Sequence, residues 1–315
     1  MDNRRVTVVM AIYNPRLDWL KEELISIQKQ TYRDFCVIVW NDNPKDNKDY
    51  DSFFKKYLIN IPFKIFIGKE NLGSNKVFEK LTQMVETSYI VYCDQDDIWM
   101  PNKLETLIQA FDDNTVLAFS DVQVINATSA IVANSISDIR PRIKLFSGQE
   151  ALKHLLVKNF ITGCTMMMKT DIAKYAIPFP IIFFHDWWLA LHAAIYGRIK
   201  LVSAPLMKYR IYDGNQSKPL NGIESKEEYY KKYILKYYEF LNLLKAKFSN
   251  VDDINICMSW AKIRISYFEK PTMSKAIKLL RMKKLVPSIV YFELVLPYLS
   301  EGVVKKILQY IKMKS

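Results

Sequence analysis

Glycine is scarce in this sequence, with 8 residues among 315, and no Gly-x-Gly-x-x-Gly pattern follows the first apolar run at 5–12. Such glycines form the phosphate loop of dinucleotide-binding folds, so their absence argues against a dehydrogenase. Low-complexity stretches and internal repeats are missing as well, which argues against a disordered chain and a repeat fold. Half of the residues are apolar and a quarter are charged, which predicts an ordinary globular core.

Cysteine is also sparse, and its four residues lie far apart without a Cys-x-x-Cys pair. They are Cys36, Cys93, Cys164 and Cys257. This spacing favours buried free thiols over a metal site or disulfides. No apolar leader pattern precedes the first apolar run, so we expect a reducing, cytoplasmic setting. An uncharged apolar run of about 18 residues is missing too, so no membrane-spanning helix is expected.

The first half of the chain alternates two patterns. Apolar runs typical of strands lie at 5–12, 35–40, 63–67, 89–93 and 116–120. Runs with apolar residues at helical spacing separate them. Alternating units of this kind predict an α/β fold, with a mostly parallel, mixed sheet covered by helices on both faces.

The last third of the chain differs in pattern and charge. After a turn-rich break at 218–222 the pattern is helical, so we expect two domains, 1–220 and 221–315. Of the net charge of +12, residues 223–315 carry nine, from 18 Lys and Arg against 9 Asp and Glu. Such a region can contact an anionic membrane, bind nucleic acid, or pack on the catalytic domain with its lysines in water. If it contacts a membrane, removal of 283–315 should release the protein.

Polar residues stand where the predicted strands end. They are Asn14, Asp42, Asp94, Asp96 and Asp121. Ligands of parallel sheets bind outside the carboxyl ends of the strands, so this edge is the expected site. On an extended chain Asp94 and Asp96 point the same way, and a divalent cation that also holds a diphosphate would relieve their repulsion. By spacing alone, a solvated acidic turn remains the alternative.

The acidic stretch is part of a longer pattern. Tyr-Cys-Asp-Gln-Asp-Asp-Ile-Trp at 92–99, with Pro-Asn-Lys-Leu at 101–104, resembles the metal-and-nucleotide motif of family 2 glycosyltransferases. Its Asp-Gln-Asp-Asp-Ile-Trp form is similar to rhamnosyltransferase-type members, which build bacterial surface polysaccharides. Further segments match the family in order, at 10–15, 26–32, 70–73, 162–165, 185–188 and 209–210. The resemblance spans roughly residues 5 to 217 and implies the GT-A fold, which has a Rossmann-like sheet.

The resemblance implies roles for the matching residues. Asp186 corresponds to the general base, and Asp96 to the ligand of a divalent cation, Mg²⁺ or Mn²⁺, on the diphosphate. The residues implied to bind the nucleotide sugar are Ala11, Tyr13, Asn14, Asp42, Asn71, Gly73, Asp94, Gln95 and Arg210. Among them, Asp42 would accept from the base and Arg210 would steady the diphosphate. The residues expected on the acceptor side or the site wall are Asp121, Thr162, Gly163, His185, Trp187 and Trp188.

These roles imply an inverting glycosyl transfer. A carboxylate deprotonates the acceptor hydroxyl, while a metal and an arginine stabilise the leaving nucleoside diphosphate. One carboxylate opposite the leaving group gives single displacement with inversion. The implied donor is a nucleotide sugar, foremost dTDP-L-rhamnose, and the acceptor is a saccharide or a lipid-linked saccharide. With such an acceptor, we expect the basic helices to dock peripherally on the inner face of the cell membrane.

Simpler explanations exist for single residues. Asp186 precedes an apolar helical pattern and would serve as an N-cap, and Asp42 would stabilise an Asx turn. Arg210 could form a surface ion pair, and the two tryptophans could pack in the core. The chain also departs from the family pattern. Only one of the usual two acids follows the second strand at 41–44, and Tyr212 stands where a histidine often lies, which puts metal binding in doubt.

Other functions remain as alternatives. A UDP-hexose-dependent enzyme of the same fold would share the motif. A nucleotidyltransferase would also use acidic metal ligands, but it usually needs a glycine-rich, basic first loop, which 11–15 is not. A nucleic-acid-binding protein would use the basic helices, yet its phosphates would be repelled by the acidic strand ends. We therefore expect no nucleic-acid partner.

Overall fold

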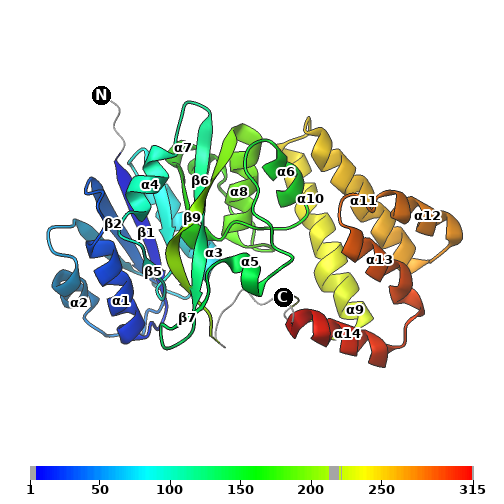
Figure 1. The fold of residues 1–315 in the computed structure, drawn as a ribbon, viewed down its shortest axis with the longest axis horizontal. Coiled ribbons are helices and arrows are strands. Elements are labelled where there is room, and N and C mark those ends of the chain that lie inside the picture. Colours follow the sequence, from blue (N-terminus) through cyan, green and yellow to red (C-terminus); the bar gives the residue numbers. More distant parts are fainter. Residues whose placement is uncertain (1–4, 213–219, 221, 314–315) are drawn as a thin grey trace. The chain divides into compact units, whose positions relative to one another are not determined.

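The computed structural model describes residues 5–212, 220 and 222–313 (Figure 1). The chain divides into two compact units, one formed by Met1–Leu155 with Asn159–Asp213 and the other by Leu156–Lys158 with Gly214–Ser315. The domain boundary expected between residues 220 and 221 falls partly outside the described residues, and it stays a prediction. Each unit contains an apolar core of its own.

The first unit is built around a mixed sheet. Its described strands are β1 (Val6–Ile12), β2 (Phe35–Asn41), β3 (Phe63–Ile67), β4 (Tyr89–Cys93), β5 (Ile98–Trp99), β6 (Thr115–Ile125), β7 (Ile131–Ala133), β8 (Met166–Lys169) and β9 (Arg198–Arg210). They lie in the order β3-β2-β1-β4-β8-β6-β9-β5, with β7 paired to β6. The first four pair in parallel, whereas β8 runs antiparallel to both β4 and β6. The expected α/β class with a mixed sheet is confirmed.

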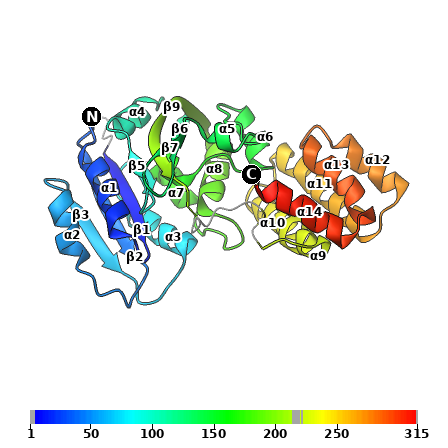
Figure 2. The ribbon, with the colours of Figure 1, turned by 60° about the horizontal axis from the view of Figure 1, so that its bottom comes forward.

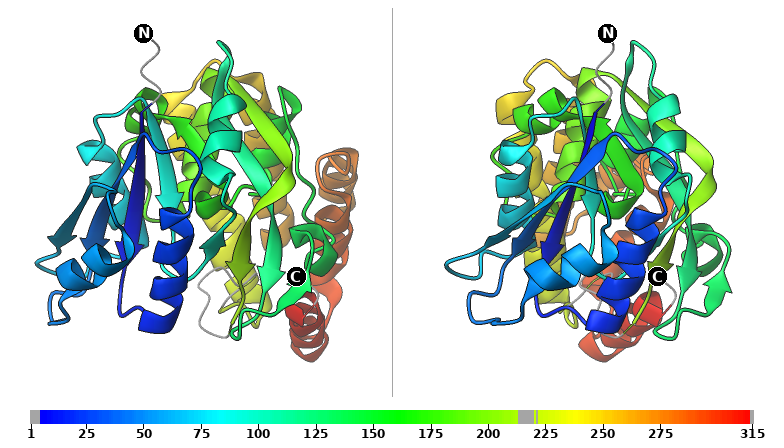
Figure 3. Two further views of the ribbon diagram at one scale, coloured as in Figure 1. Left: turned by 60° about the vertical axis from the view of Figure 1, so that its left-hand side comes forward. Right: turned by 90° about the vertical axis from the view of Figure 1, so that its left-hand side faces the viewer.

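Helices cover both faces of this sheet (Figures 2 and 3). They are α1 (Leu17–Gln28), α2 (Tyr50–Tyr57), α3 (Ser74–Met84), α4 (Lys103–Gln109), α5 (Ile136–Ile139), α6 (Glu150–Leu155), α7 (Thr170–Tyr175) and α8 (His185–Tyr196), with a 3₁₀ turn η1 (Gly163–Thr165). Leu20 and Leu24 of α1 share one core with Val8 and Val37 of the sheet. Both faces of β1 are buried because its residues are almost all apolar, as is usual for a central parallel strand.

The register of the central strands aligns the candidate site. Ile12 pairs with Asn41 and Met10 with Cys93, so β2, β1 and β4 end at neighbouring levels of the sheet. The segments that follow these strands therefore meet at the carboxyl edge of the sheet. Ligands of open α/β sheets bind at this kind of edge.

The second unit is helical. Its elements are α9 (Lys226–Tyr229), a π-helical turn η2 (Tyr230–Leu235), α10 (Lys236–Lys247), α11 (Asp252–Glu269), α12 (Met273–Arg281), α13 (Pro287–Val295), a 3₁₀ turn η3 (Leu296–Tyr298) and α14 (Glu301–Met313). Leu296 and Leu308 lie in its core with Ile234, and α14 lies beside α9 (Figures 1 and 2). Arg264 donates from Nε to both oxygens of Glu293, at 3.0 and 2.9 Å, and both side chains are buried. None of the described helices is both long and apolar enough to span a bilayer.

Candidate active site

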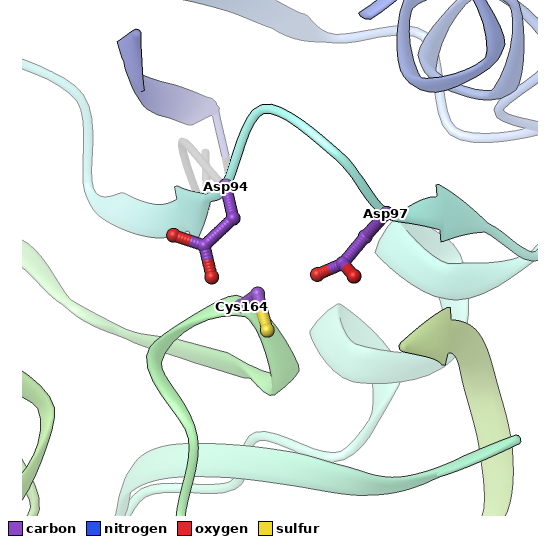
Figure 4. A group of neighbouring side chains, drawn as sticks. All are labelled: Asp94, Asp97 and Cys164. Atoms are coloured by element: carbon purple, nitrogen blue, oxygen red, sulfur yellow. The ribbon is translucent and has the colours of Figure 1, made fainter. Parts of the chain in front are cut away.

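The acidic stretch forms a turn between β4 and β5. The backbone bends at Gln95 and Asp96, so the carboxylate of Asp97 returns toward that of Asp94, with the Cys164 thiol beside them (Figure 4). Donor atoms of Asp94, Asp97 and Cys164 lie within 4.8 Å of one another. The expectation that Asp94 and Asp96 share one face assumed an extended chain. The backbone is bent at these residues and the group around Asp94 contains Asp97, while the shared site of Asp94 and Asp96 stays a prediction.

The carboxyl groups of this turn disfavour one another's charge. Burial raises the pKa of Asp94, and the Asp96 carboxylate raises it further. Burial also raises the pKa of Asp96, although the Tyr212 hydroxyl donates to its carboxylate. A divalent cation would relieve this repulsion, and Asp94 and Asp96 offer the oxygen ligands that Mg²⁺ and Mn²⁺ prefer. The Cys164 thiol suits such ions poorly, and burial raises its pKa well above the usual range.

A buried lysine lies under the turn. Lys103, the first residue of α4, is fully buried and donates from Nζ to the carbonyl of Cys164 at 2.5 Å. The ammonium also lies 3.8 Å from the ring centre of Trp99. Its positive charge opposes the rise that burial causes in the pKa of Glu23 on α1. The ammonium of Lys103 thus already supplies a positive charge beside Asp94, Asp97 and Cys164. We therefore do not assign a metal ion to these three residues.

Arg210 supports the turn from within the protein. Its guanidinium is fully buried and donates to the carbonyl of Asp96 at 2.7 Å, to Ser129 Oγ at 2.9 Å and to Glu22 at 2.6 Å. Its backbone N–H donates to Asp97 Oδ1 at 2.9 Å. These contacts fix the conformation of the turn. The expected contact of Arg210 with a diphosphate stays a prediction.

The loop after β1 is joined to the turn. Tyr13 donates its backbone N–H to Gln95 Oε1 at 2.8 Å, and Gln95 Nε2 donates back to the Tyr13 carbonyl at 3.2 Å. Asn14 has a left-handed backbone, with φ of 46°, and its side chain accepts from Asn43 Nδ2 at 2.6 Å. Asn tolerates this conformation better than most residues. Ala11 lies on β1 opposite Trp40, just before this loop. Tyr13, Asn14 and Gln95 are thus brought together.

Asp42 anchors the loop that precedes α3. Its carboxylate, which is buried, accepts from the backbone N–H of Leu72 at 3.0 Å and of Gly73 at 2.8 Å. Gly73 has φ of 78°, which glycine adopts without strain, and Asn71 Oδ1 also accepts from its N–H. The described contacts of Asp42 fasten β2 to the start of α3.

Asp186 lies in the first turn of α8. Its Oδ1 accepts from the N–H of Trp187 at 2.6 Å and from Asn159 Nδ2 at 3.1 Å, and its Oδ2 accepts from the N–H of Gly163 at 3.2 Å. Burial raises its pKa to about 6, although the three hydrogen bonds oppose this rise. The N-cap of α8 is Phe184, so Asp186 is not the capping residue. Its charge also contributes to the raised pKa of Asp94.

The aromatic neighbours of Asp186 are held in place by packing and by backbone carbonyls. The His185 ring stacks on Phe78 at 4.3 Å, and burial lowers its pKa to about 3, so it is neutral. Both ring nitrogens lack a hydrogen-bond partner among the described residues. Trp187 donates from Nε1 to the Leu155 carbonyl, and buried Trp188 donates to the Ala176 carbonyl, both at 2.6 Å.

Two further expected residues support neighbouring loops. Asp121 accepts from the N–H of Ile136 at 3.2 Å and so ties β6 to α5. The carbonyl of Thr162 accepts from the Thr165 hydroxyl and closes η1, which carries Gly163. The place of Asp121 and Thr162 in the site wall stays a prediction.

Residues that hold the site together were not singled out from the sequence. They are Glu22, Glu23, Asn75, Lys103 and Asn159. Lys103 had one local signal, its place in the motif segment Pro-Asn-Lys-Leu at 101–104. The two asparagines had none, because their partners lie more than 25 residues away along the chain.

The chain is similar to known glycosyltransferases. The sequence profile described as Glycosyl transferase family 2 matches residues 7–175. An uncharacterized glycosyltransferase of Methanocaldococcus jannaschii is 32% identical over 242 residues, which cover 75% of this chain and 80% of that protein. A UDP-Glc:alpha-D-GlcNAc-diphosphoundecaprenol beta-1,3-glucosyltransferase of Escherichia coli is 23% identical, covering 67% of this chain and 79% of that protein. A dTDP-rhamnosyl transferase of Shigella flexneri is 25% identical, covering 66% and 73% respectively.

A solved structure has the same fold. The S. aureus TarS structure in complex with UDP-GlcNAc superimposes with a TM-score of 0.61 over 98% of this chain and 92% of that chain. The sequence identity is 14%, so this likeness concerns the fold alone.

Proposed function

The chain belongs to glycosyl transferase family 2, and on that basis we propose that it transfers L-rhamnose from dTDP-L-rhamnose, with inversion, in the synthesis of a bacterial surface polysaccharide. The chain is a nucleotide-sugar glycosyltransferase with a GT-A-type fold. One observation carries the reaction type. The Asp186 carboxylate accepts from the N–H of Gly163 at 3.2 Å, and the thiol of the next residue, Cys164, lies within 4.8 Å of a carboxylate oxygen of Asp94. The proposed base is thus joined by one short segment to the acidic edge expected to hold the diphosphate.

Asp186 is the proposed general base. With a pKa of about 6 it is ionised at neutral pH, yet it is more basic than an ordinary carboxylate. The N–H groups of Gly163 and Trp187 and the Asn159 amide orient it toward the acceptor hydroxyl. After the proton moves to Asp186, the alkoxide oxygen attacks the anomeric carbon and the nucleoside diphosphate departs from the opposite face. A single displacement of this kind inverts the anomeric centre.

The donor is proposed to lie along the joined loops after β1, β2 and β4. Tyr13 and Asn14 would flank the nucleoside, Asn71 and Gly73 would complete that wall, and Asp94 would face the ribose. Asp96 would hold Mg²⁺ or Mn²⁺, which when bound neutralises charge on the leaving diphosphate. The Gln95 clamp on the Tyr13 backbone supports this arrangement, because it keeps the nucleoside loop and the metal ligands in one unit.

The acceptor is proposed to be a lipid-linked saccharide. Support comes from α12, where Met273, Ile277 and Leu280 are 78%, 45% and 39% exposed. These positions are four and three residues apart and form one stripe of the helix, which we call the α12 stripe. Lys278 and Arg281 lie on the same helix. An apolar stripe with basic neighbours favours the surface of an anionic bilayer, here the inner face of the cell membrane.

The identity of the donor has one competitor. A UDP-hexose is the second candidate, because the relative from Escherichia coli is named for UDP-Glc and the TarS structure contains UDP-GlcNAc. The Asp-Gln-Asp-Asp-Ile-Trp segment and the relative from Shigella flexneri favour the rhamnosyl donor.

A panel of donors tests the proposal. Hydrolysis and binding of dTDP-L-rhamnose, UDP-Glc and UDP-GlcNAc are measured with Mg²⁺, with Mn²⁺ and with a chelator. We expect metal-dependent turnover of dTDP-L-rhamnose that exceeds that of the UDP-sugars by at least ~10-fold, the usual discrimination of a shaped pocket. Preference for a UDP-sugar selects the second candidate. Turnover unchanged by the chelator contradicts the metal role of Asp96, and binding of none of the donors contradicts the proposed function.

A further inference from the structure

The side chain of Asn75 joins α3 to the segment that leads into α8. Its Nδ2 donates to the carbonyls of Pro180, at 2.9 Å, and Phe183. Its Oδ1 accepts from the backbone N–H of His185 at 2.9 Å. One amide therefore makes three hydrogen bonds to residues that lie about a hundred positions away along the chain, immediately before Asp186.

These bonds replace a missing helix cap. The first N–H groups of a helix have no partner within the helix and usually receive one from the N-cap side chain. The N-cap of α8 is Phe184, whose side chain has no acceptor, and the structure gives it no capping bond. Asn75 supplies the acceptor for His185 from another element. In addition, Glu79 on the next turn of α3 accepts from the N–H of Phe179 at 2.5 Å, so α3 holds the segment at two points.

The same helix is anchored to the donor side of the site. Asp42 binds the N–H groups of Leu72 and Gly73 just before α3 begins. Asn75 lies two residues after Gly73. The loop after β2 and the segment before Asp186 are therefore joined through the start of α3, by hydrogen bonds of Asp42 on one side and of Asn75 on the other.

We infer that Asn75 is a positioning residue, which sets the direction of the Asp186 carboxylate by capping α8 from α3. The inference rests on the proposed role of Asp186 as general base. When the cap is lost, the first turn of α8 frays, and Asp186 loses its alignment with the N–H of Trp187 and of Gly163. Misplacement of a catalytic group by about 1 Å can lower a rate by roughly 10²-fold.

The variant Asn75→Ala tests the inference at saturating donor and acceptor. We expect kcat to fall ~10–100-fold, while the dissociation constant for the donor changes less than about twofold, since Asn75 makes no described contact with the proposed donor loops. Asn75→Asp keeps the acceptor for the N–H of His185 but loses the N–H groups that bind the carbonyls of Pro180 and Phe183. Its kcat should lie between those of wild type and Asn75→Ala. Asp49→Ala is the matched control, because Asp49 caps α2 through Ser52 at 3.0 Å, away from Asp186. It should lose thermal stability and keep its kcat.

The closing measurement is the double variant with Asp186→Asn. If Asn75 acts through Asp186, adding Asn75→Ala to Asp186→Asn lowers the residual rate no further. An equal fractional loss in both backgrounds overturns the inference, because it marks a general structural effect. A normal kcat in Asn75→Ala, with Asp186→Asn inactive, also overturns it and leaves the base assignment intact. Normal transfer by Asp186→Asn removes the base from the proposed function, and the inference fails with it.

Discussion

Asp186 and Asp94 both have pKa values raised by burial, but their surroundings differ. Three N–H donors point at the Asp186 carboxylate, so it can hold a negative charge and still accept a proton. Asp94 faces the charges of Asp96 and Asp186, which disfavour its ionised form. In the proposed mechanism, groups placed in this way divide the work between a base and a cation site. Both residues are aspartates, so this difference in proposed role follows from their local contacts and not from residue type.

The pH dependence of transfer tests the assignment of Asp186. The base must be ionised, and its pKa is raised to about 6, so kcat/KM should fall about tenfold per pH unit below pH 6 and reach a plateau above it. Asp186→Asn should lower transfer at pH 7.5 at least ~10²-fold with donor binding retained. As a control, Asp112→Asn alters a surface carboxylate paired with Arg198 at 2.5 Å and should keep the wild-type profile. A profile that stays flat from pH 5 to 8 speaks against Asp186 as the base.

Single residues differ in how far the sequence predicts them. The acidic turn and Asp186 were predicted because their neighbours along the chain form a recognisable pattern. The burial of Arg210 was not predicted, because no local pattern shows that a strand-end arginine is buried under a turn from another part of the chain. Asn75 was missed for the same reason. Its partners are brought close only by the packing of α3 against α8, and hydrogen bonds of this kind leave no periodic pattern.

At the scale of elements, the C-terminal helices show what the pattern left open. Their amphipathic pattern was compatible with membrane contact at 283–315 or with packing inside the protein. In the structure, Val290, Leu296 and Leu308 are fully buried, and Glu293 pairs with Arg264 inside the unit. The apolar face of those helices thus fills a core, because periodicity shows that a helix has an apolar face but not what covers it. Deletion of this segment would unfold the unit and would not test membrane contact.

Substitutions in the α12 stripe give a cleaner test of membrane contact. Met273→Ser, Ile277→Ser and Leu280→Ser together remove exposed apolar side chains, each of which contributes roughly 1.5–3 kcal/mol when fully buried. Sedimentation with vesicles of anionic lipid should then show at least ~10-fold weaker binding.

The matched control carries serine at Leu243, Ile256 and Val303, which are 44%, 45% and 43% exposed on other helices of the unit. It should bind like wild type, and both proteins should melt as cooperatively as the parent. Equal losses in the two variants would mean that α12 has no special part in the contact. If the wild-type protein bound vesicles of purely zwitterionic lipid as tightly as anionic vesicles, the proposed attraction of the basic residues to an anionic bilayer would be contradicted.

At the scale of the whole molecule, net charge and composition determine what the protein attracts. The chain carries +12 overall, while the proposed active site is acidic. The two charges therefore suit different partners, an anionic surface for the basic residues and a cation for the carboxylates. Composition favours an anionic surface as a partner, and the strand-end pattern favours a cation. The sequence did not show which basic residues lie on the exposed surface.

Ionic strength separates these two effects in one experiment. Transfer is measured with a lipid-linked acceptor in anionic vesicles and with a short, water-soluble form of the same saccharide. Because salt shortens the reach of surface charges from about 10 Å at 0.1 M to about 3 Å at 1 M, transfer in vesicles should fall steeply with salt. The partly buried groups around Asp186 are screened far less, so transfer to the soluble acceptor should change little. A parallel decline with both acceptors would locate the salt effect in the active site, and no decline with either would exclude an electrostatic role of the basic unit at the membrane.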